Sequence, residues 1–309
     1  MIKKNTVLNV ENLTKTFTKT IIQGISFSLQ AGEILGLLGP NGAGKTTTIQ
    51  MLLGTLSPTS GSINYFNSNF FTHRSACLQK IGFASTYVNM PQRLTVYENL
   101  KIQAMLYGFK GNNLHNALTK YIELFKLHDL MQKQFGELSA GQKTRAMLAK
   151  AFITNPEIVL LDEPTASLDP DVAEQIRSFI VTMRNEYNIA VLLTSHNMQE
   201  VASICDRVVV LQHGHIIANA QPSILAASIA SSRIELLTTD NLTTLMTMLH
   251  THNIPHTQTN NLVEIQVNEE DIAQLLHSIA TQGIMYSKIS IKKPSLEEYF
   301  LHIAQQSLL

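Results

Sequence analysis

The chain has 309 residues, which is long enough for one large domain and a small second domain. Lys and Arg together number 23, as do Asp and Glu, so the formal net charge is zero and a nucleic-acid-binding surface is not indicated. The two cysteines, Cys77 and Cys205, lack the spacing of metal ligands and indicate a reducing, cytoplasmic setting. Residues 1–13 lack the apolar core of a signal peptide, and no apolar run reaches the ~20 residues that span a bilayer, so we expect a soluble protein.

Strand-like segments at residues 6–10 and 24–29 lead to a glycine-rich segment. Residues 33–38 (EILGLL) predict an apolar strand, and Gly44 opens a helical pattern. Glycines allow backbone conformations closed to other residues, so the N–H groups here can turn inward while the positive end of the helix faces an anion. An ordinary glycine-rich turn is the alternative, but every position of a phosphate loop is matched, namely Gly39, Pro40, Asn41, Gly42, Ala43, Gly44, Lys45 and Thr46.

Two side chains of this loop carry its chemistry. Lys45 supplies a point charge for the β- and γ-phosphates of a nucleotide, and the Thr46 hydroxyl supplies a ligand for Mg²⁺. Thr47 follows them in the first turn of the helix. The segment therefore predicts binding of a nucleotide with Mg²⁺.

The middle of the chain contains a second candidate anion site. Helical patterns fill much of residues 94–126, and the sequence LSAGQ follows at residues 138–142. Ser139 and Gln142 have the spacing of a capping box that opens a helix over residues 143–153. A helix start that also carries Gly141 and free N–H groups can bind an anion, so local capping and anion binding are both predicted.

Two carboxylates follow a predicted buried strand at residues 158–161 (IVLL). Asp162 can hold magnesium through a water molecule, and Glu163 comes next in the sequence. A solvated turn before Pro164 is the alternative interpretation. A buried strand that runs directly into two acids favours a catalytic site.

Strands and helices then alternate through residues 157–212, and a short strand pair surrounds residues 213–214, which together predict a parallel sheet flanked by helices. Asp169 before Pro170 predicts a helix start, with the aspartate as N-cap. His196 follows an apolar strand at residues 190–195. A lone histidine after a strand is usually structural.

From residue 222 the composition shifts to Ser, Thr, Asn, Gln and His, and no nucleotide motif follows. After a helix-like segment at residues 223–230, the pattern predicts the order βαββαβα up to residue 304, with a turn at residues 260–261. Ser295 and Glu298 predict a capping box for the last helix. We expect a small α+β domain of the ferredoxin-like type.

The order of GPNGAGKT, LSAGQ and LLDEP resembles the ATP-binding subunit of ABC transporters. This resemblance implies an α/β P-loop NTPase cassette over residues 1–221, with a parallel sheet core, an antiparallel β-subdomain and a helical subdomain at about residues 94–155 that carries LSAGQ. Residues 222–309 would form the accessory domain. The sequence SLEEYF at residues 295–300 is similar to the C-terminus of drug- and polymer-exporting subunits of the two-gene (ABC-2) type.

The resemblance also implies roles for single residues. Glu163 would be the general base that polarises the attacking water, and His196 would contact the γ-phosphate. Phe17 would stack on adenine, although a core phenylalanine is a competing interpretation. The LSAGQ residues would face the γ-phosphate held by a second copy of the chain, and residues 167–169, which include Asp169, would cross the dimer interface.

The chain departs from the family pattern at two places. Ala140 stands where the family consensus has glycine, a small change. Thr86 stands where the family usually has a glutamine that reaches magnesium and links the site to the membrane partner. Gln92 is the nearest glutamine, six residues later. This departure concerns coupling to the partner and leaves nucleotide binding unaffected.

The resemblance implies an ATPase that powers a separately encoded integral membrane permease, from the cytoplasmic face of the membrane. Residues 86–108 would contact that permease, and export is the expected direction. A soluble ABC ATPase that acts on ribosomes or DNA is the alternative, but it usually has two cassettes or long coiled coils. A regulatory module without turnover is disfavoured because Glu163 and His196 are both present. The cargo is set by the permease.

Overall fold

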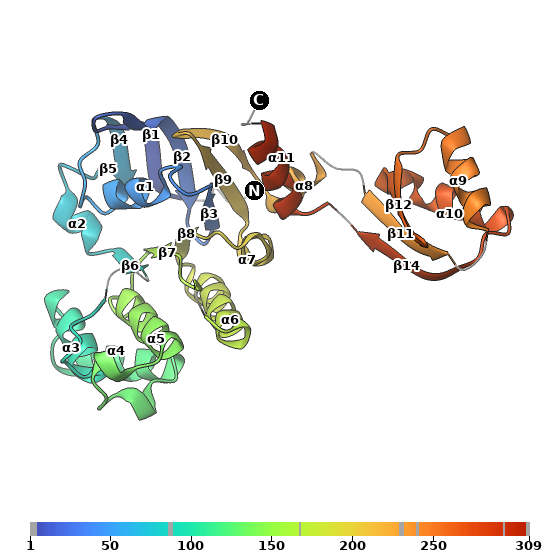
Figure 1. The fold of residues 1–309 in the computed structure, drawn as a ribbon. Coiled ribbons are helices and arrows are strands. Elements are labelled where there is room, and N and C mark those ends of the chain that lie inside the picture. Colours follow the sequence, from blue (N-terminus) through green and yellow to red (C-terminus); the bar gives the residue numbers. More distant parts are fainter. Residues whose placement is uncertain are drawn as a thin grey trace. The chain divides into compact units, whose positions relative to one another are not determined.

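The computed structural model describes residues 5–85, 89–166, 168–228, 232–238, 241–292 and 294–306 (Figure 1). The chain divides into two compact units, Met1–Gln221 and Pro222–Leu309. Each unit has its own cluster of buried apolar side chains. Within the described ranges, no helix combines the length and the hydropathy of a membrane span.

A six-stranded sheet with the order β10-β9-β3-β8-β7-β6 forms the centre of the first unit. Neighbouring strands from β9 to β6 run parallel, and only β10 is antiparallel. The central strands are buried on both faces, as expected for continuous apolar runs. The strands are β3 (Ile34–Leu38), β6 (Ile81–Ser85), β7 (Ile158–Asp162), β8 (Ala190–Thr194), β9 (Arg207–Gln212) and β10 (His215–Ala220).

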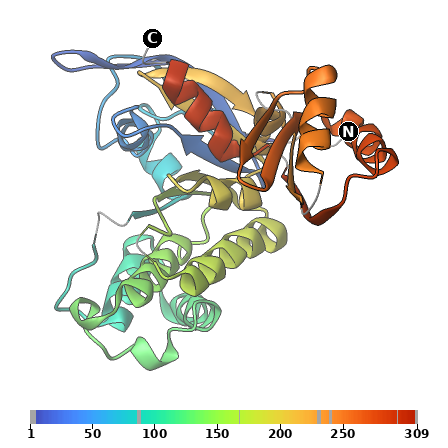
Figure 2. The ribbon, with the colours of Figure 1, turned by 45° about the vertical axis from the view of Figure 1, so that its right-hand side comes forward.

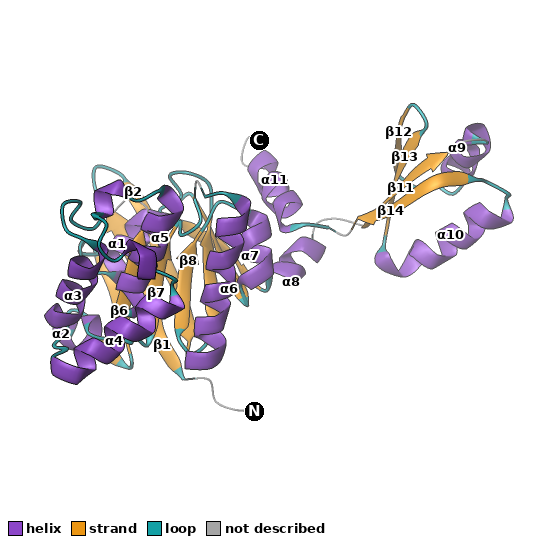
Figure 3. Cartoon of the chain, turned by 90° about the horizontal axis from the view of Figure 1, so that it is seen from below, coloured by secondary structure: helices purple, strands orange, loops and turns teal. Residues whose placement is uncertain are grey.

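The order of this sheet brings three candidate segments to one edge. Strands β3, β8 and β7 are neighbours and parallel, so the segments that follow their carboxyl ends lie side by side. These segments are the phosphate loop, His196 and the pair Asp162–Glu163. Three helices follow the same strands, namely α1 (Lys45–Leu52), α6 (Pro170–Tyr187) and α7 (Met198–Ile204), and Figure 3 shows helices beside the sheet.

A second, antiparallel sheet has the order β2-β1-β4-β5. Its strands are β1 (Thr6–Thr16), β2 (Thr20–Gln30), β4 (Ser60–Tyr65) and β5 (Ser68–Asn69), followed by helix α2 (Arg74–Leu78). β1 and β2 extend beyond the predicted segments because their pairing continues through polar residues to Thr16 and Thr20. The turn between them carries Phe17, which places the residue at the end of a hairpin.

The helical part of the first unit contains α3 (Val96–Leu106), α4 (Gly111–Leu124) and α5 (Ala140–Phe152), which pack on one another. The green helices group away from the blue strands of the antiparallel sheet in Figures 1 and 2. Helix α5 also packs against β6, next to the central sheet. A capping box formed by Thr95 and Glu98 fixes the start of α3.

The second unit has the predicted order βαββαβα after the short helix α8 (Pro222–Ala227). Its antiparallel sheet has the order β12-β13-β11-β14, in which β13 separates β11 from β12 as in a split βαβ arrangement. The predicted capping box of Ser295 and Glu298 is present. The elements are β11 (Ser232–Thr238), α9 (Leu242–Thr251), β12 (His256–Thr259), β13 (Leu262–Val267), α10 (Ile272–Thr281), β14 (Tyr286–Lys292) and α11 (Leu296–Gln306).

Because the two clusters of buried side chains share no residue, a core change in one unit should leave the other intact. Leu249 on α9 is fully buried. We expect Leu249→Ala to lower the free energy of unfolding of residues 222–309 by about 2–5 kcal/mol through lost burial and a cavity. Hydrogen-exchange mass spectrometry on the full chain measures both units, with the exposed Thr247→Ala on the same helix as control. An equal loss of protection in residues 5–221 would contradict this independence.

Candidate nucleotide and hydrolysis site

A cavity of about 410 Å³ opens between the phosphate loop, the end of β7 and the β1–β2 turn. Half of the residues predicted to bind the nucleotide line this cavity, together with Asp162 and Glu163, although they come from distant parts of the sequence. The cavity is lined by Phe17, Ile21, Asn41, Gly42, Gly44, Lys45, Thr46, Thr47, Asp162 and Glu163. Gly39, Pro40 and Ala43 belong to the same loop without lining the cavity. One cavity therefore joins the predicted adenine, phosphate and magnesium contacts.

Glycine is needed in the phosphate loop for two different physical reasons, namely backbone conformation and close packing. Gly39, Gly42 and Gly44 all have positive φ, at 151°, 81° and 106°. A Cβ atom on Gly39 would lie 2.3 Å from the Leu211 carbonyl oxygen, and one on Gly44 would lie 2.2 Å from Ile22 Cδ1. No heavy atom approaches a Cβ on Gly42 within 4 Å, so its conformation alone requires glycine. The loop shape is thus fixed by packing at both ends.

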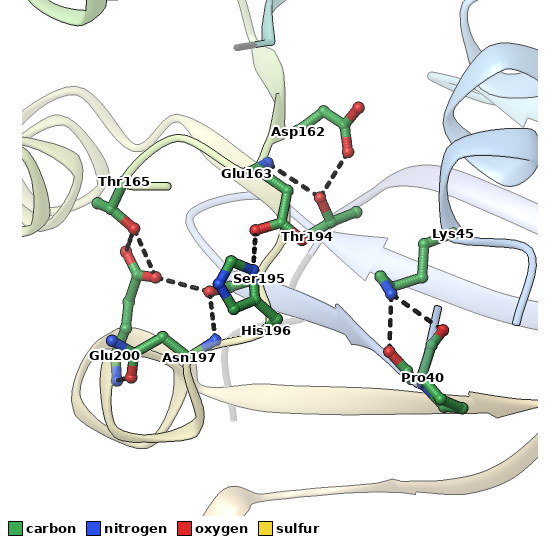
Figure 4. A network of polar contacts seen from close by, with 11 residues as sticks. Pro40, Lys45, Asp162, Glu163, Thr165, Thr194, Ser195, His196, Asn197 and Glu200 are labelled. Carbon is green, nitrogen blue, oxygen red and sulfur yellow. Dashed lines mark hydrogen bonds and ion pairs between the residues drawn. The ribbon is translucent and has the colours of Figure 1, made fainter. Parts of the chain in front are cut away.

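Lys45 begins α1 and folds back onto its own loop. Its Nζ donates hydrogen bonds to the Gly39 carbonyl at 2.7 Å and to the Pro40 carbonyl at 3.2 Å (Figure 4). Burial lowers the pKa of Lys45, while the nearby carboxylates of Glu163 and Asp162 act in the opposite direction. The ammonium group thus lies between two loop carbonyls, within the electrostatic field of both acids.

Asp162 ends β7 and is only 4% exposed. Hydroxyl groups from the two flanking strands hold its carboxylate. Thr194 Oγ1 on β8 donates to Oδ1 at 2.7 Å, and Ser85 Oγ on β6 donates to Oδ2 at 3.4 Å. Neither hydroxyl group carries a charge that would compete with a cation. The carboxylate is therefore fixed in position, with lone pairs remaining for a metal-bound water.

Glu163 has a left-handed backbone with φ of 55°, which is uncommon for a residue with a side chain. Its N–H donates to Thr194 Oγ1 at 3.0 Å and to the Thr194 carbonyl at 3.2 Å. Its carboxylate contacts His196 Nδ1 at 2.6 Å (Figure 4). Because an ionised carboxylate can only accept, Nδ1 carries the proton in this contact. The structure thus pairs the two predicted catalytic side chains.

The LSAGQ segment forms the predicted capping box at the start of α5. Ser139 Oγ accepts from the Gln142 N–H at 3.4 Å, and Gln142 Oε1 accepts from the Ser139 N–H at 3.1 Å. Gly141 also has a packing reason that the sequence does not reveal, because a Cβ there would lie 3.0 Å from Val172 Cγ1 on α6. Ser139, Gly141 and Gln142 do not line the cavity of their own chain.

The remaining predicted residues have mixed outcomes. Asp169 occupies the N-cap position before Pro170, as predicted, but its exposed carboxylate makes no capping hydrogen bond. The Asp169 main-chain carbonyl instead accepts from the Ala173 N–H at 2.9 Å. The predicted helix start with Asp169 as N-cap and Pro170 as first helical residue is therefore present, without a side-chain capping hydrogen bond. Thr86 and Ser167 lie outside the described residues.

Several polar residues around the site were not predicted. Thr194 and Ser85 hold Asp162, and a buried glutamate at position 200 binds hydroxyl groups next to Glu163 and His196. For Thr194 and Ser85, the sequence signal is a hydroxyl side chain at the carboxyl end of an apolar strand. Their partners lie 32, 77 and up to 35 residues away, so sequence spacing alone does not pair them.

The chain is similar in sequence to known proteins. A family model described as ABC transporter matches residues 22–166, and a second, described as AAA domain, putative AbiEii toxin, Type IV TA system, matches residues 133–202. The linearmycin resistance ATP-binding protein LnrL of Bacillus subtilis is 30% identical over 310 residues, which cover 98% of this chain and 99% of the relative. This chain belongs to the ABC transporter ATP-binding family. The Nod factor export ATP-binding protein I of Burkholderia lata is 36% identical over 226 residues, covering 72% of this chain and 73% of the relative.

Solved structures of ABC ATPases have the same fold. The structure of cbiO1 from Clostridium perfringens, part of the ABC transporter complex cbiONQ, has a TM-score of 0.67 and 27% identity and covers 73% of this chain and 92% of that one. A dimeric ATP-binding cassette in a post-hydrolysis state, bound to ADP and Pi, has a TM-score of 0.64 and covers 69% of this chain and 98% of that one. The predicted P-loop cassette and ATPase class are confirmed.

The hydroxyl of Thr194 joins Asp162 to the Glu163 backbone and is fully buried, so its removal should be costly. We expect Thr194→Val to lower the free energy of unfolding by about 1–3 kcal/mol, since it leaves a buried carboxylate oxygen without its donor. Thermal or urea unfolding measures the loss. Thr182→Val is the matched control, because that hydroxyl donates to the Ser178 carbonyl of its own helix and does not join two segments of the chain. Equal stability of the two variants would contradict the role of Thr194.

Proposed function

We propose that this chain is the ATP-hydrolysing subunit of an ABC exporter, which works as a dimer and powers a separately encoded membrane permease. The observation that carries the proposal is the Glu163–His196 pair, whose carboxylate lines the same cavity as Lys45. A binding module without turnover has no need of a polarising carboxylate beside the phosphate loop. Membership of the ABC ATP-binding family supports this assignment.

In this proposal, Lys45 and the loop N–H groups hold the β- and γ-phosphates of ATP, and Lys45 exchanges its loop carbonyls for phosphate oxygens. Phe17 stacks on adenine. Phe17 is 56% exposed, and Lys15 Nζ lies 4.9 Å from the centroid of its ring, which leaves the other face of the ring for a base. These contacts recognise the two chemical features of the nucleotide, its phosphates and its adenine base.

Magnesium fits the donor set of this cavity. The Thr46 hydroxyl and the Asp162 carboxylate are oxygen donors, which Mg²⁺ prefers, and both line the cavity. No cluster of three or more His, Cys, Asp or Glu side chains that could hold a metal occurs among the described residues. We therefore propose that Mg²⁺ binds together with ATP, with phosphate oxygens and water completing its coordination.

Hydrolysis then follows from the position of Glu163. A water between its carboxylate and the γ-phosphate transfers a proton to Glu163 as its oxygen bonds to phosphorus and the bond to the β-phosphate oxygen breaks. His196 donates to Glu163 through Nδ1. Its side chain is 68% exposed, so the ring is accessible to the γ-phosphate. This pair supplies the proton acceptor and its orientation.

The other half of each site comes from a second copy of the chain. Ser139, Gly141 and Gln142 lie at the start of α5, where free N–H groups and the helix dipole attract an anion. They do not line their own cavity, so they are available to cap the γ-phosphate bound by a partner. Asp169 is exposed at the start of α6 and would lie at this interface. ATP binding closes the dimer and hydrolysis reopens it.

The permease assignment is supported by an exposed apolar surface on α3. Tyr97, Ile102, Met105 and Leu106 are exposed, with Leu106 at 75%. They fall within residues 86–108, the segment expected to contact a membrane partner. Similar proteins are named for Nod factor export, linearmycin resistance and bacitracin transport, which favours export over action on ribosomes or DNA. We infer a location on the cytoplasmic face of the membrane, through the permease.

Replacement of Glu163 should separate binding from chemistry. Glu163→Gln keeps the side-chain shape but removes the charge that polarises water, so the hydrolysis rate should fall by about two to four orders of magnitude. ATP affinity should persist because Lys45 and Thr46 are untouched. The trapped ATP should hold two chains together, giving a dimer with ATP and a monomer with ADP by light scattering.

Ser139→Arg provides the matched control, because a long cationic side chain at the start of α5 blocks the cap on a partner's ATP. Added to Glu163→Gln, it should abolish the ATP-dependent dimer. A Glu163→Gln chain that hydrolyses ATP at the parental rate would remove Glu163 from the mechanism. A chain that stays monomeric with saturating ATP would contradict the shared site.

We further propose that Pro222–Leu309 is an accessory domain, because the candidate catalytic groups all lie before it. A chain that ends at Gln221 should bind ATP with the affinity of the full chain, since it retains the cavity and its own core. Calorimetric titration with ATP measures this. Loss of ATP binding by the folded, truncated chain would show that the accessory domain contributes to the nucleotide site.

A further inference from the structure

Glu200 is a buried carboxylate next to the catalytic pair, without a role in the mechanism above. It lies on α7 and is 2% exposed. Thr165 Oγ1 lies 2.7 Å from both of its carboxylate oxygens, and Ser195 Oγ donates to Oε2 at 2.7 Å (Figure 4). One carboxylate therefore joins two segments of the chain that are 30 residues apart in sequence, at Thr165 and Ser195.

The burial of Glu200 is costly, because a carboxylate loses its hydration in the protein interior. No Lys, Arg or His within the described ranges forms an ion pair with it. The hydroxyl groups of Thr165 and Ser195 are its side-chain partners instead. An apolar residue would fill this space without that cost, so the contact with both hydroxyls is what the glutamate contributes.

The two segments that Glu200 joins are the ones that carry the catalytic pair. Thr165 lies in the turn that begins at Glu163, whose carbonyl accepts from the Ala166 N–H at 3.2 Å. Ser195 directly precedes His196 in the chain. Each of the two hydroxyls that Glu200 binds therefore belongs to a residue within two positions of one member of the Glu163–His196 pair. Asp169, four residues after Thr165 at the start of α6, is proposed to meet the partner copy.

Glu200 is itself held in place by the start of its helix. Asn197 Oδ1 accepts from the Gln199 N–H and from the Glu200 N–H, both at 3.1 Å. Ser195 Oγ also accepts from the Asn197 N–H at 3.0 Å. The carboxylate and the two hydroxyls thus form a connected set of hydrogen bonds, which links the segment at Thr165 to the segment at Ser195.

We propose that Glu200 is a positioning residue that holds Glu163 and His196 in their mutual geometry and carries displacements of Thr165 to His196. This inference rests on the proposed function, because it assumes that Glu163 and His196 act on ATP. A displacement of Thr165 on dimer closure would then reach the hydrolytic pair through one carboxylate. Glu200 does not line the nucleotide cavity, so it acts on the rate of hydrolysis and leaves ATP binding unchanged.

The test is steady-state ATP hydrolysis by the full chain. Glu200→Ala should lower kcat roughly 10- to 100-fold with KM for ATP unchanged, because small displacements of catalytic groups have effects of this size. Glu200→Gln should recover part of the loss, since its amide oxygen accepts from one hydroxyl while its NH₂ group donates to the other. Gln199→Ala, exposed on the same helix, is the matched control and should leave kcat unchanged.

A double-mutant cycle separates this role from a general loss of packing. Thr165→Val removes one of the two hydroxyl contacts of Glu200 and should lower kcat in the parental chain. In the Glu200→Ala chain the same change should have no further effect, because its partner is already absent. Ser195→Ala removes the other hydroxyl contact, with a smaller but remaining effect in the Glu200→Ala chain, because Ser195 Oγ also accepts from the Asn197 N–H. If Glu200→Ala does not fold, the same cycle is measured with Glu200→Gln, in which each hydroxyl change should have a reduced effect.

Two results would overturn the inference. One is a folded Glu200→Ala chain with parental kcat, and the other is full additivity of the Thr165 and Glu200 changes. The Glu163→Gln chain separates these results from failure of the proposed function. If Glu163→Gln is inactive while Glu200→Ala is fully active, the positioning role alone is wrong. If Glu163→Gln is active, the assignment of the hydrolytic pair is wrong instead.

Discussion

The backbone conformation of Glu163 is the constraint on which the geometry of the candidate hydrolytic site depends. A left-handed residue with a side chain persists only where its surroundings determine it, and here the parallel register of β7 and β8 places Thr194 directly beside Asp162. The Thr194 hydroxyl then binds the Asp162 carboxylate and the Glu163 N–H together. The chain turns sharply after the strand, and the Glu163 carboxylate meets His196 instead of continuing along the sheet edge.

Local features of this protein could be predicted from sequence, and contacts between distant segments could not. The phosphate loop and the capping box at Ser139 depend on residues within a few positions of one another, and the order βαββαβα follows from alternating periodicity. The Glu200 contacts, and the packing of Gly141 against Val172, require the fold to bring distant segments together. Asp169 shows the opposite case, in which a favourable capping residue leaves its side chain exposed.

The residues predicted to contact the γ-phosphate fall into two separate groups within one chain. Lys45, Asp162 and Glu163 line one cavity and His196 contacts Glu163, while Ser139 at the start of α5 does not line that cavity. In the proposed function a second copy supplies the remaining γ-phosphate contacts, and ATP binding would do mechanical work on whatever is attached to the helical part. The exposed apolar side chains of α3, such as Leu106, would then be the surface on which that work acts.

Site-directed cross-linking tests the shared site most directly. Asn41 lines the cavity and Ser139 is exposed, while the native Cys77 and Cys205 are buried and should not interfere. In a Glu163→Gln chain carrying Asn41→Cys and Ser139→Cys, oxidation with ATP should give a covalent dimer on a non-reducing gel, and oxidation with ADP should not. A disulfide formed only within one chain, or a dimer yield that is the same with and without ATP, would contradict the account.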